Sequence, residues 1–289
     1  MKRFLKYIDK KLSINEIHSI AHHLNQSYYA YMLDEQVWDL INKVFPSSFE
    51  ACLSKLQQKY VGHKIVNTIL THYYPGERLI KYHLVKNFVK NKDEIAIFEM
   101  RIQNSRLDVG RINGLSYAYE IKTELDTLAK LEKQVNDYAQ VFEYVTVIIH
   151  PKHIKKAKEI LPTYCGIDII NLDDNNNYFF ESERKALNSP DLNPEIQIHT
   201  LTSKDLEFIL RTKKQKVPLR RQERESLIAK CLSKEEINYY FKEAVKQRYL
   251  ERWNFLRSSF NKINPIDIQE LYIGPIDPKY IYYRRSSMV

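Results

Sequence analysis

Two acidic residues and a lysine are spaced so that they could meet on neighbouring strands. Asp108 lies in one alternating run, and Glu120 and Lys122 lie in the next. Asn113-Gly114 between the runs is typical of a hairpin turn, which would bring Asp108 near residues 119–120. Because side chains alternate along a strand, Glu120 and Lys122 point to one face. Carboxylates bind hard cations such as Mg2+, and an ammonium suits a phosphate or a developing anion.

The elements that would position these residues follow an α/β pattern. Apolar residues at helical spacing alternate with short β-branched runs, and the run over residues 144–150 is typical of a buried central strand. The expected helices span residues 77–90, 124–142 and 152–161, and the expected strands span 95–102, 105–112, 115–122, 144–150, 167–172 and 178–180. This order predicts an α/β fold with a mixed central sheet flanked by helices.

Helical segments are expected on both sides of this core. The expected flanking helices span residues 14–32, 33–44, 48–60, 203–211, 222–232 and 233–257. Residues 182–199, with Pro190 and Pro194, predict a linker, and the tail over 262–289 predicts a loop-like segment. We therefore divide the chain into a helical segment at 1–73, a core at 74–182 and a mainly helical region at 183–289.

Composition limits the class of protein. The chain has 289 residues, enough for a sizeable core, with ordinary charged and hydrophobic fractions of 28% and 44%. It has no run of 18 apolar residues, and its basic start lacks the apolar stretch of a secretory signal. Three distant cysteines argue against a disulfide framework or a Cys-rich zinc site. We expect a cytoplasmic protein without membrane contact.

The net charge of +9 is unevenly distributed. Residues 200–289 hold 19 Lys and Arg against 11 Asp and Glu, whereas the residues before them hold 26 against 25. A basic stretch over residues 211–224 lies between two expected helices, and its candidate nucleic-acid contacts are Lys213, Lys214, Lys216, Arg220 and Arg221. Such a stretch can bind backbone phosphates without reading sequence, although it could also be a solvated loop between helices.

The chain resembles the PD-(D/E)XK nuclease superfamily. The resemblance is carried by Asp108, by Glu120-Ile121-Lys122, and by Gln134 with Tyr138, which match the Gln-x-x-x-Tyr signature of RecB-like members. More narrowly, the chain is similar to an uncharacterised bacterial and phage-associated group of that superfamily. Leu107 stands where the superfamily's name has a proline, which is a common departure. The first 73 and last 35 residues have no recognisable counterpart.

The resemblance implies a restriction-endonuclease-like core and a Mg2+ cofactor, with Mn2+ as a substitute. It implies that Asp108 and Glu120 bind the metal directly, with help from the carbonyl of Ile121. The further residues implied are Glu77 as an additional acid from its helix, Lys122 to polarise the attacking water, and Gln134 and Tyr138 to orient Lys122 or a phosphate. Glu99, on the preceding strand, is an alternative acid.

Several of these residues also have a structural interpretation. Arg106 could contact a phosphate or hold Asp108, and this pair could be no more than a surface ion pair. Tyr138 is in phase with an apolar stripe of its expected helix, so it should pack partly in the core whether or not it also has a role in the site. An acid at Glu77 would also complement the helix dipole.

The leading hypothesis is a metal-dependent nuclease that acts on DNA rather than RNA, in defence or mobile-element processing. The alternative is a nuclease-fold protein that binds nucleic acid, or scaffolds a complex, without cutting. A protein partner or a homo-oligomer would be compatible with either hypothesis.

Overall fold

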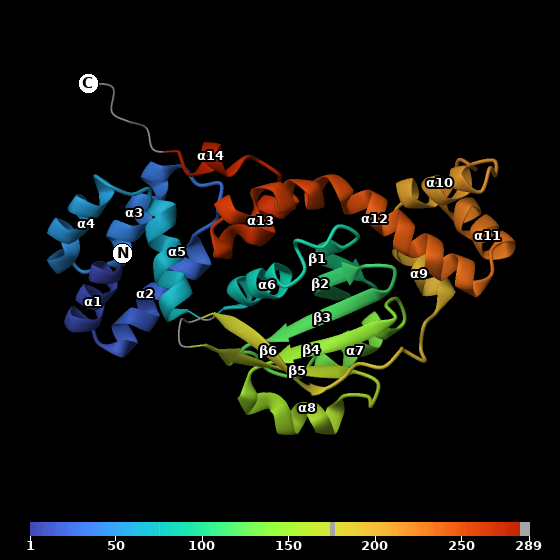
Figure 1. The fold of residues 1–289 in the computed structure, drawn as a ribbon, viewed down its shortest axis with the longest axis horizontal. Coiled ribbons are helices and arrows are strands. Elements are labelled where there is room, and N and C mark those ends of the chain that lie inside the picture. Colours follow the sequence, from blue (N-terminus) through green and yellow to red (C-terminus); the bar gives the residue numbers. More distant parts are fainter. Residues whose placement is uncertain (75, 174–176, 284–289) are drawn as a thin grey trace. The chain divides into compact units, whose positions relative to one another are not determined.

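The computed structural model describes residues 1–74, 76–173 and 177–283, which form two compact units (Figure 1). The first unit combines Met1–Tyr82 with Phe255–Val289, and the second unit is His83–Asn254. The last segment of the chain is thus grouped with the N-terminal helices. Within the described residues, no helix is both long enough and apolar enough to cross a membrane.

The first unit is helical. Its elements are α1 (Lys2–Lys11), α2 (Ile14–Ser27), α3 (Asp34–Val44), η1 (Ser47–Phe49), α4 (Glu50–Gln57), α5 (Gly62–Tyr73), most of α6 (Glu77–Lys86), the end of α12 (Lys234–Ser259), η3 (Phe260–Lys262), η4 (Pro265–Asp267), α13 (Ile268–Ile273) and α14 (Pro278–Ile281). Ser13 and Glu16 form a capping box that starts α2. A cluster of buried apolar side chains, which includes Trp38 and Phe49, packs the helices from α1 through α5 together.

Two expectations for this unit are corrected. The helix expected over 14–32 ends at Ser27, since residues 28–33 pass in a short connection to α3. The tail is not loop-like where it is described, because α13 and α14 form there; residues 284–289 lie outside the described residues. Pro278 lies in the first turn of α14, directly after the Asp277 cap. A proline at this position is typical of a helix start, whereas the tail's prolines had been taken as a sign of a loop.

The second unit contains a six-stranded mixed sheet in the order β1-β2-β3-β4-β5-β6 (Figure 1). The strands are β1 (Ile95–Ile102), β2 (Ser105–Ile112), β3 (Ser116–Lys122), β4 (Tyr144–Ile149), β5 (Gly166–Leu172) and β6 (Tyr178–Arg184). The first three are antiparallel, β4 and β5 continue parallel to β3, and β6 returns antiparallel. The predicted mixed α/β architecture is confirmed in this unit. β6 continues beyond the short strand expected there.

The turn between β2 and β3 sets their register. Ile112 pairs with Ser116, so the loop has three residues instead of the two that Asn113-Gly114 suggested. Gly114 has a φ of 98°, a conformation that residues with a side chain rarely adopt. The Asn113 side chain accepts a hydrogen bond from the N–H of Leu115 at 3.3 Å. The hairpin itself was predicted correctly, and only the turn differs.

The helix expected over 124–142 is shorter. Helix α7 spans Leu131–Ala139 and packs against β2, β3 and β4. The preceding residues form a turn in which the N–H and hydroxyl of Thr123 both donate to Asp126, at 2.7 and 2.6 Å. This local pairing competes with helix formation at the start of the segment. After β4 come η2 (Pro151–His153) and α8 (Ile154–Ile160).

Four helices complete the second unit. They are α9 (Pro194–Thr200), α10 (Ser203–Thr212), α11 (Arg221–Cys231) and the first part of α12. The expectation of a linker over 182–199 is wrong at its end, where α9 begins. Asn193 accepts bonds from the N–H groups of Glu195 and Ile196, and Pro194 occupies the first turn, which together form a standard helix start.

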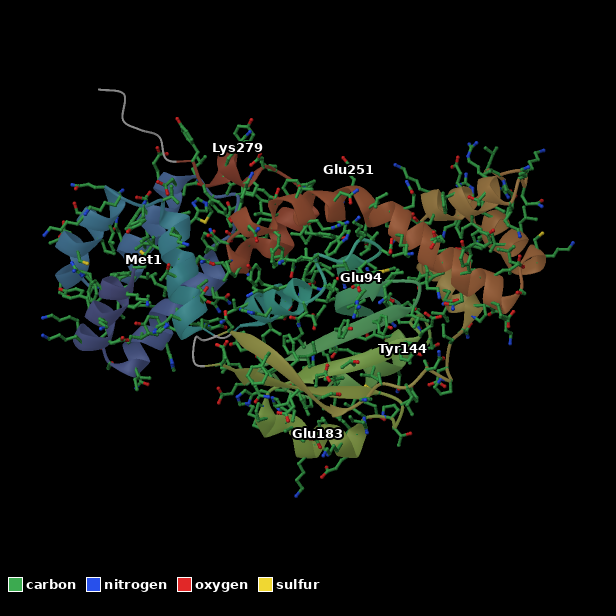
Figure 2. The ribbon with its side chains drawn as sticks, in the orientation of Figure 1. Met1, Glu94, Tyr144, Glu183, Glu251 and Lys279 are labelled. Atoms are coloured by element: carbon green, nitrogen blue, oxygen red, sulfur yellow. The ribbon has the colours of Figure 1, made fainter. Side chains whose placement is uncertain are left out.

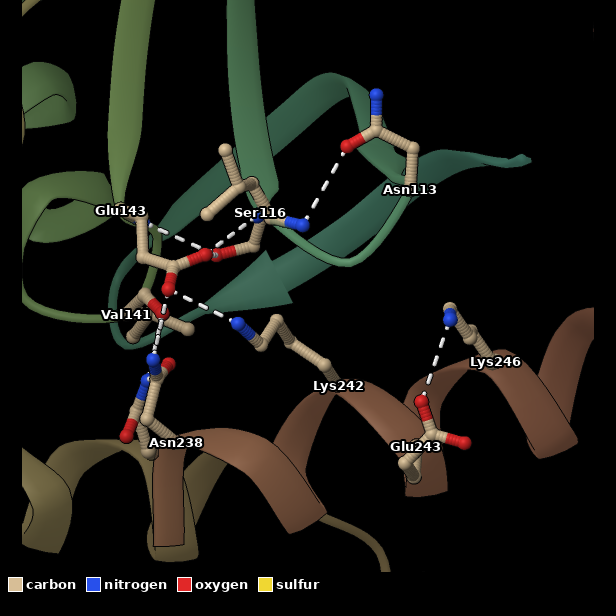
Figure 3. A network of polar contacts seen from close by, with 10 residues as sticks. Asn113, Ser116, Val141, Glu143, Asn238, Lys242, Glu243 and Lys246 are labelled. Atoms are coloured by element: carbon tan, nitrogen blue, oxygen red, sulfur yellow. Dashed lines mark hydrogen bonds and ion pairs between the residues drawn. The ribbon is translucent and has the colours of Figure 1, made fainter. Parts of the chain in front are cut away.

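A buried ion pair fixes α12 to the sheet (Figure 3). Glu143, just before β4, accepts bonds from the N–H of Ser116 at 2.6 Å, from Asn238 at 2.8 Å and from Lys242 at 2.9 Å. Burial alone would raise the pKa of Glu143, but these hydrogen bonds and the Lys242 charge more than offset it, so the pKa is lowered. The second unit is therefore held together by a satisfied charge in its interior.

Candidate functional site

The register of the second unit's sheet gathers three acids. It places Glu99, Asp108 and Glu120 in one row across β1, β2 and β3. One carboxylate oxygen of Glu99 and one of Asp108 lie within 4.8 Å of each other. Asp108 is half-buried, and its carboxylate accepts a hydrogen bond from the N–H of Ile121 at 2.7 Å. The predicted approach of Asp108 to the end of β3 is confirmed.

Glu120 is the most buried acid of the row, with its side chain 2% exposed. Its Oε1 accepts hydrogen bonds from Lys122 and from the amide of Gln134, both at 2.6 Å. Its Oε2 lies 2.8 Å from the hydroxyl of Tyr138. Lys122 shares the strand face of Glu120, whereas Gln134 and Tyr138 reach it from one face of α7. The structure therefore gathers three of the predicted residues, Lys122, Gln134 and Tyr138, around Glu120.

Tyr138 also has the structural role that its apolar phase predicted. It is fully buried, and its hydroxyl lies 2.8 Å from the main-chain carbonyl of Arg106 as well as from Glu120. Burial raises the pKa of the Tyr138 phenol strongly, and the negative charge of Glu120 adds to this. The phenol therefore keeps its proton and acts as a hydrogen-bond donor.

Glu99 adopts an uncommon backbone conformation. Its φ is 56°, in the left-handed region that side-chain-bearing residues seldom occupy, and the strand pairing is interrupted at this position. Its carboxylate pairs with the guanidinium of Arg106 at 2.6 Å. The sequence raised Glu99 only as an alternative acid; its place opposite Asp108 follows from the two-residue turn at 103–104. Arg106 thus pairs with Glu99, one strand away from the Asp108 that was first considered.

Gln134 leaves one buried polar atom unsatisfied. Its amide donates to Glu120, but its Oε1 has no hydrogen-bond partner among the described residues. A buried acceptor without a donor is uncommon in folded proteins and costs free energy. The polar cluster around Glu120 thus has one acceptor that could take a further donor.

Glu77 opens α6 in the first unit. There its carboxylate pairs with the buried ammonium of Lys81, four residues along the helix, at 2.5 Å. Its part in the acidic site remains a prediction.

The five basic candidates of the C-terminal region fall into two groups. Lys213 pairs with Glu236 at 2.9 Å, and Arg221 pairs with Glu225 at 2.8 Å. The other three are exposed and form no ion pair with the described residues; they are Lys214, Lys216 and Arg220. The basic surface between α10 and α11 is thus partly neutralised by its own acids.

Comparisons with known proteins place the chain in a family. The family model described as bacteriophage P4 protein cII matches residues 76–272, which include all six strands and α7 to α12. Protein cII of Enterobacteria phage P4 is 29% identical over 96 residues, 32% of this chain and 36% of that protein. The similarity to this relative thus spans little more than a third of its length. No solved structure matches the chain significantly. Because the family model covers more than half of the sequence, the chain belongs to the bacteriophage P4 protein cII family.

Proposed function

We propose that this protein is a metal-dependent nuclease that hydrolyses phosphodiester bonds in DNA. The observation that carries the proposal is the arrangement of Glu120, almost fully buried and bonded to Lys122, beside the half-buried Asp108. Burying a carboxylate is costly unless it is paired, so two acids and a lysine gathered at one point favour a chemical role. The protein would work in the cytoplasm, where nucleic acid is accessible.

The sheet supports a restriction-endonuclease-like core of the PD-(D/E)XK type. Three antiparallel strands are followed by a helix and a parallel strand, and the acids lie on β2 and β3. Gln134 and Tyr138, one turn apart on α7, face the site as the Gln-x-x-x-Tyr resemblance implies, but they bond Glu120 and not the Lys122 that the resemblance suggested as their partner.

The donor set fits a hard divalent cation. Asp108 and Glu120 supply carboxylate oxygens, and the Ile121 carbonyl between the two motif residues could add a third. The Lys122 ammonium, 2.6 Å from Glu120, places a positive charge where the acids attract one. The unpartnered buried oxygen of Gln134 is consistent with a further water or ion beside the cluster. When bound, Mg2+ or Mn2+ would act as a Lewis acid that neutralises charge at the scissile phosphate.

The residues of the chain would divide the remaining tasks. Lys122 is a donor with no acceptor, so it can stabilise negative charge on the phosphate and orient the attacking water. Tyr138 keeps its proton and fixes Glu120 by hydrogen bonding, and Gln134 does the same from one turn earlier. The exposed Lys214, Lys216 and Arg220 could attract the DNA backbone without reading its sequence.

One observation favours the alternative, a protein that binds nucleic acid without cutting it. Both oxygens of Glu120 already have partners within the chain, namely Lys122, Gln134 and Tyr138. A network that is satisfied internally can also serve to fix a core. Cleavage assays separate the two functions.

The test is a cleavage panel on circular and linear duplex DNA, single-stranded DNA and RNA, each with Mg2+, Mn2+ or EDTA. Wild-type protein is compared with Asp108→Asn and Lys122→Met, and Lys156→Ala on the exposed surface of α8 is the matched control. We expect metal-dependent cutting of DNA by wild type and control, and a loss of at least about 100-fold in both site variants.

Cutting that persists in Asp108→Asn and Lys122→Met would contradict the proposed site. Absence of cutting in every condition, with salt-sensitive DNA binding equal in all four proteins, would favour the binding protein. Circular dichroism of each variant ensures that a loss of cutting reflects the site and not the fold.

A further inference from the structure

Two arginines face each other on the β1–β2 hairpin. Arg101 and Arg106 are direct cross-strand partners, two residues away from the Glu99 and Asp108 positions. Both side chains are exposed. Like charges directly opposite each other destabilise an antiparallel pair, and Glu99 pairs with Arg106 but forms no ion pair with Arg101 in the described part of the chain.

Arg111, a third arginine of the same hairpin, has the contacts expected of a structural residue. Arg111 donates two hydrogen bonds to Glu94, at 2.6 and 2.7 Å, and its guanidinium lies over the rings of Phe88 and Tyr117 (Glu94 is labelled in Figure 2). By contrast, Arg101 has a single long contact, 3.5 Å from its Nε to the Gln103 carbonyl, and forms no ion pair within the described part of the chain. Arg101 is not held by the fold.

Arg106 is held at its backbone and exposed at its guanidinium. Its carbonyl lies 2.8 Å from the Tyr138 hydroxyl, which also contacts Glu120, so its main chain is fixed beside the acidic row. Its side chain is 75% exposed although it pairs with Glu99, whose side chain is only 12% exposed. The cation therefore covers a nearly buried acid from the solvent side. The guanidinium therefore remains open to a second anion on its solvent side.

We propose that Arg101 and Arg106 form a clamp for the backbone phosphates of a nucleic-acid strand, and that Arg106 exchanges Glu99 for a phosphate when the strand binds. Guanidinium groups bind phosphate, as they bind carboxylate, through two parallel hydrogen bonds, so a phosphate on the solvent side can take the place of the Glu99 carboxylate. A bound phosphate would then offset both positive charges, whereas Glu99 pairs with Arg106 alone. The inference rests on the proposed function, because it deepens how that site would receive its substrate.

The clamp is tested by binding instead of cleavage. Fluorescence anisotropy in EDTA measures the affinity of full-length protein for labelled duplex DNA, single-stranded DNA and RNA over a series of salt concentrations. We expect Arg101→Ala and Arg106→Ala each to weaken binding about 3- to 10-fold and to lower the salt slope by about one. Lys156→Ala, which removes an exposed cation on α8, serves as the control and should leave both quantities unchanged. The probe that responds identifies the preferred strand.

A double-mutant cycle tests the exchange itself. Glu99→Gln removes the competing acid, so it should tighten binding in wild type but give clearly less gain when Arg106 is already Ala. An equal gain in both backgrounds would mean only reduced general repulsion and would overturn the exchange. Affinity and salt slope unaffected by both arginine substitutions would overturn the clamp.

The design separates this inference from the proposed function. Arginine-dependent binding without any metal-dependent cutting supports the clamp and contradicts hydrolysis. Metal-dependent cutting with arginine-independent binding and unchanged KM supports hydrolysis and contradicts the clamp.

Discussion

A buried acid in the first unit predicts a pH-dependent stability. Asp267 is fully buried, and its Oδ2 accepts hydrogen bonds from Tyr282 at 2.6 Å, Tyr28 at 3.1 Å and Asn264 at 3.2 Å. Its Oδ1 has no partner among the described residues. Burial raises the pKa of Asp267 from 3.8 to about 6, while these hydrogen bonds act in the opposite direction and the nearby Glu270 adds to the rise.

The direction of the pH dependence follows because protonation of Asp267 is linked to folding. A carboxyl group whose pKa is higher in the folded protein binds its proton more tightly there, so the protonated form contributes stability at low pH. That contribution is lost as the pH rises from about 4 to about 6, and above this range the ionised group costs about 3 kcal/mol. Replacing Asp267 with Asn removes the titration while it keeps a side-chain acceptor for the tyrosines. Asp267→Asn should therefore stabilise the first unit by about 2–3 kcal/mol more at pH 7.5 than at pH 4.

The two tryptophans allow this unit to be followed separately. Trp38 lies in the first unit and Trp253 in the second, and both are buried. In a Trp253→Phe background, the fluorescence of Trp38 reports urea unfolding of the first unit alone. The free energy of unfolding is measured at pH 4, 5, 6 and 7.5 with Asp and with Asn at position 267. Parallel pH profiles for the two proteins would refute the reasoning, because they would mean that Asp267 does not titrate between folded and unfolded states.

Three further substitutions test the second unit. Tyr138→Phe removes a buried donor to Glu120 and should lower the free energy of unfolding by about 1–3 kcal/mol, measured by urea unfolding followed at the second unit's tryptophan. A change below 0.5 kcal/mol would mean that the hydroxyl is not a significant partner. Glu143→Met leaves the Lys242 ammonium buried without its acid and should cost about 3–5 kcal/mol, seen as a large fall in Tm; an unchanged Tm would show that solvent reaches the ammonium. Gly110→Ala would place a Cβ 3.2–3.3 Å from the side chains of Leu107 and Ile97 and should cost about 1–3 kcal/mol by thermal unfolding; an unchanged Tm would show that these side chains can move aside.

Much of the second unit could be predicted from the sequence because local signals agreed there. Alternating residues and the Asn113-Gly114 turn fixed the hairpin, and the spacing of four between Gln134 and Tyr138 placed both on one helix face. The start of α7 was missed because the pairing of Thr123 with Asp126 is a local turn inside a sequence that also suits a helix. The prolines around α9 were read as a linker, although Asn193-Pro194 is a helix start.

Other features depend on contacts between distant parts of the chain. Tyr282 and Asp267 of the tail bond to each other, and Asp267 also bonds to Tyr28, more than two hundred residues away. Nothing in the local pattern of the tail predicts a partner at that distance. The ion pair between Glu99 and Arg106 was missed for a different reason. Glu99 forms it from a left-handed conformation, which side-chain-bearing residues rarely adopt and which sequence propensity therefore does not indicate.

The candidate site depends more on register than on any single side chain. Because the side chains of a strand alternate, a slip of one residue between β2 and β3 would turn Asp108 away from the face that carries Glu120. The three-residue loop fixes that register through Gly114, whose φ of 98° few other residues accept. Helix α7 then reinforces it, since Tyr138 contacts the Arg106 carbonyl on β2 and the Glu120 carboxylate on β3 with one hydroxyl. The residue that resembles a catalytic signature is thus also the residue that locks two strands together. A change at Tyr138 should consequently alter the alignment of Asp108 with Glu120.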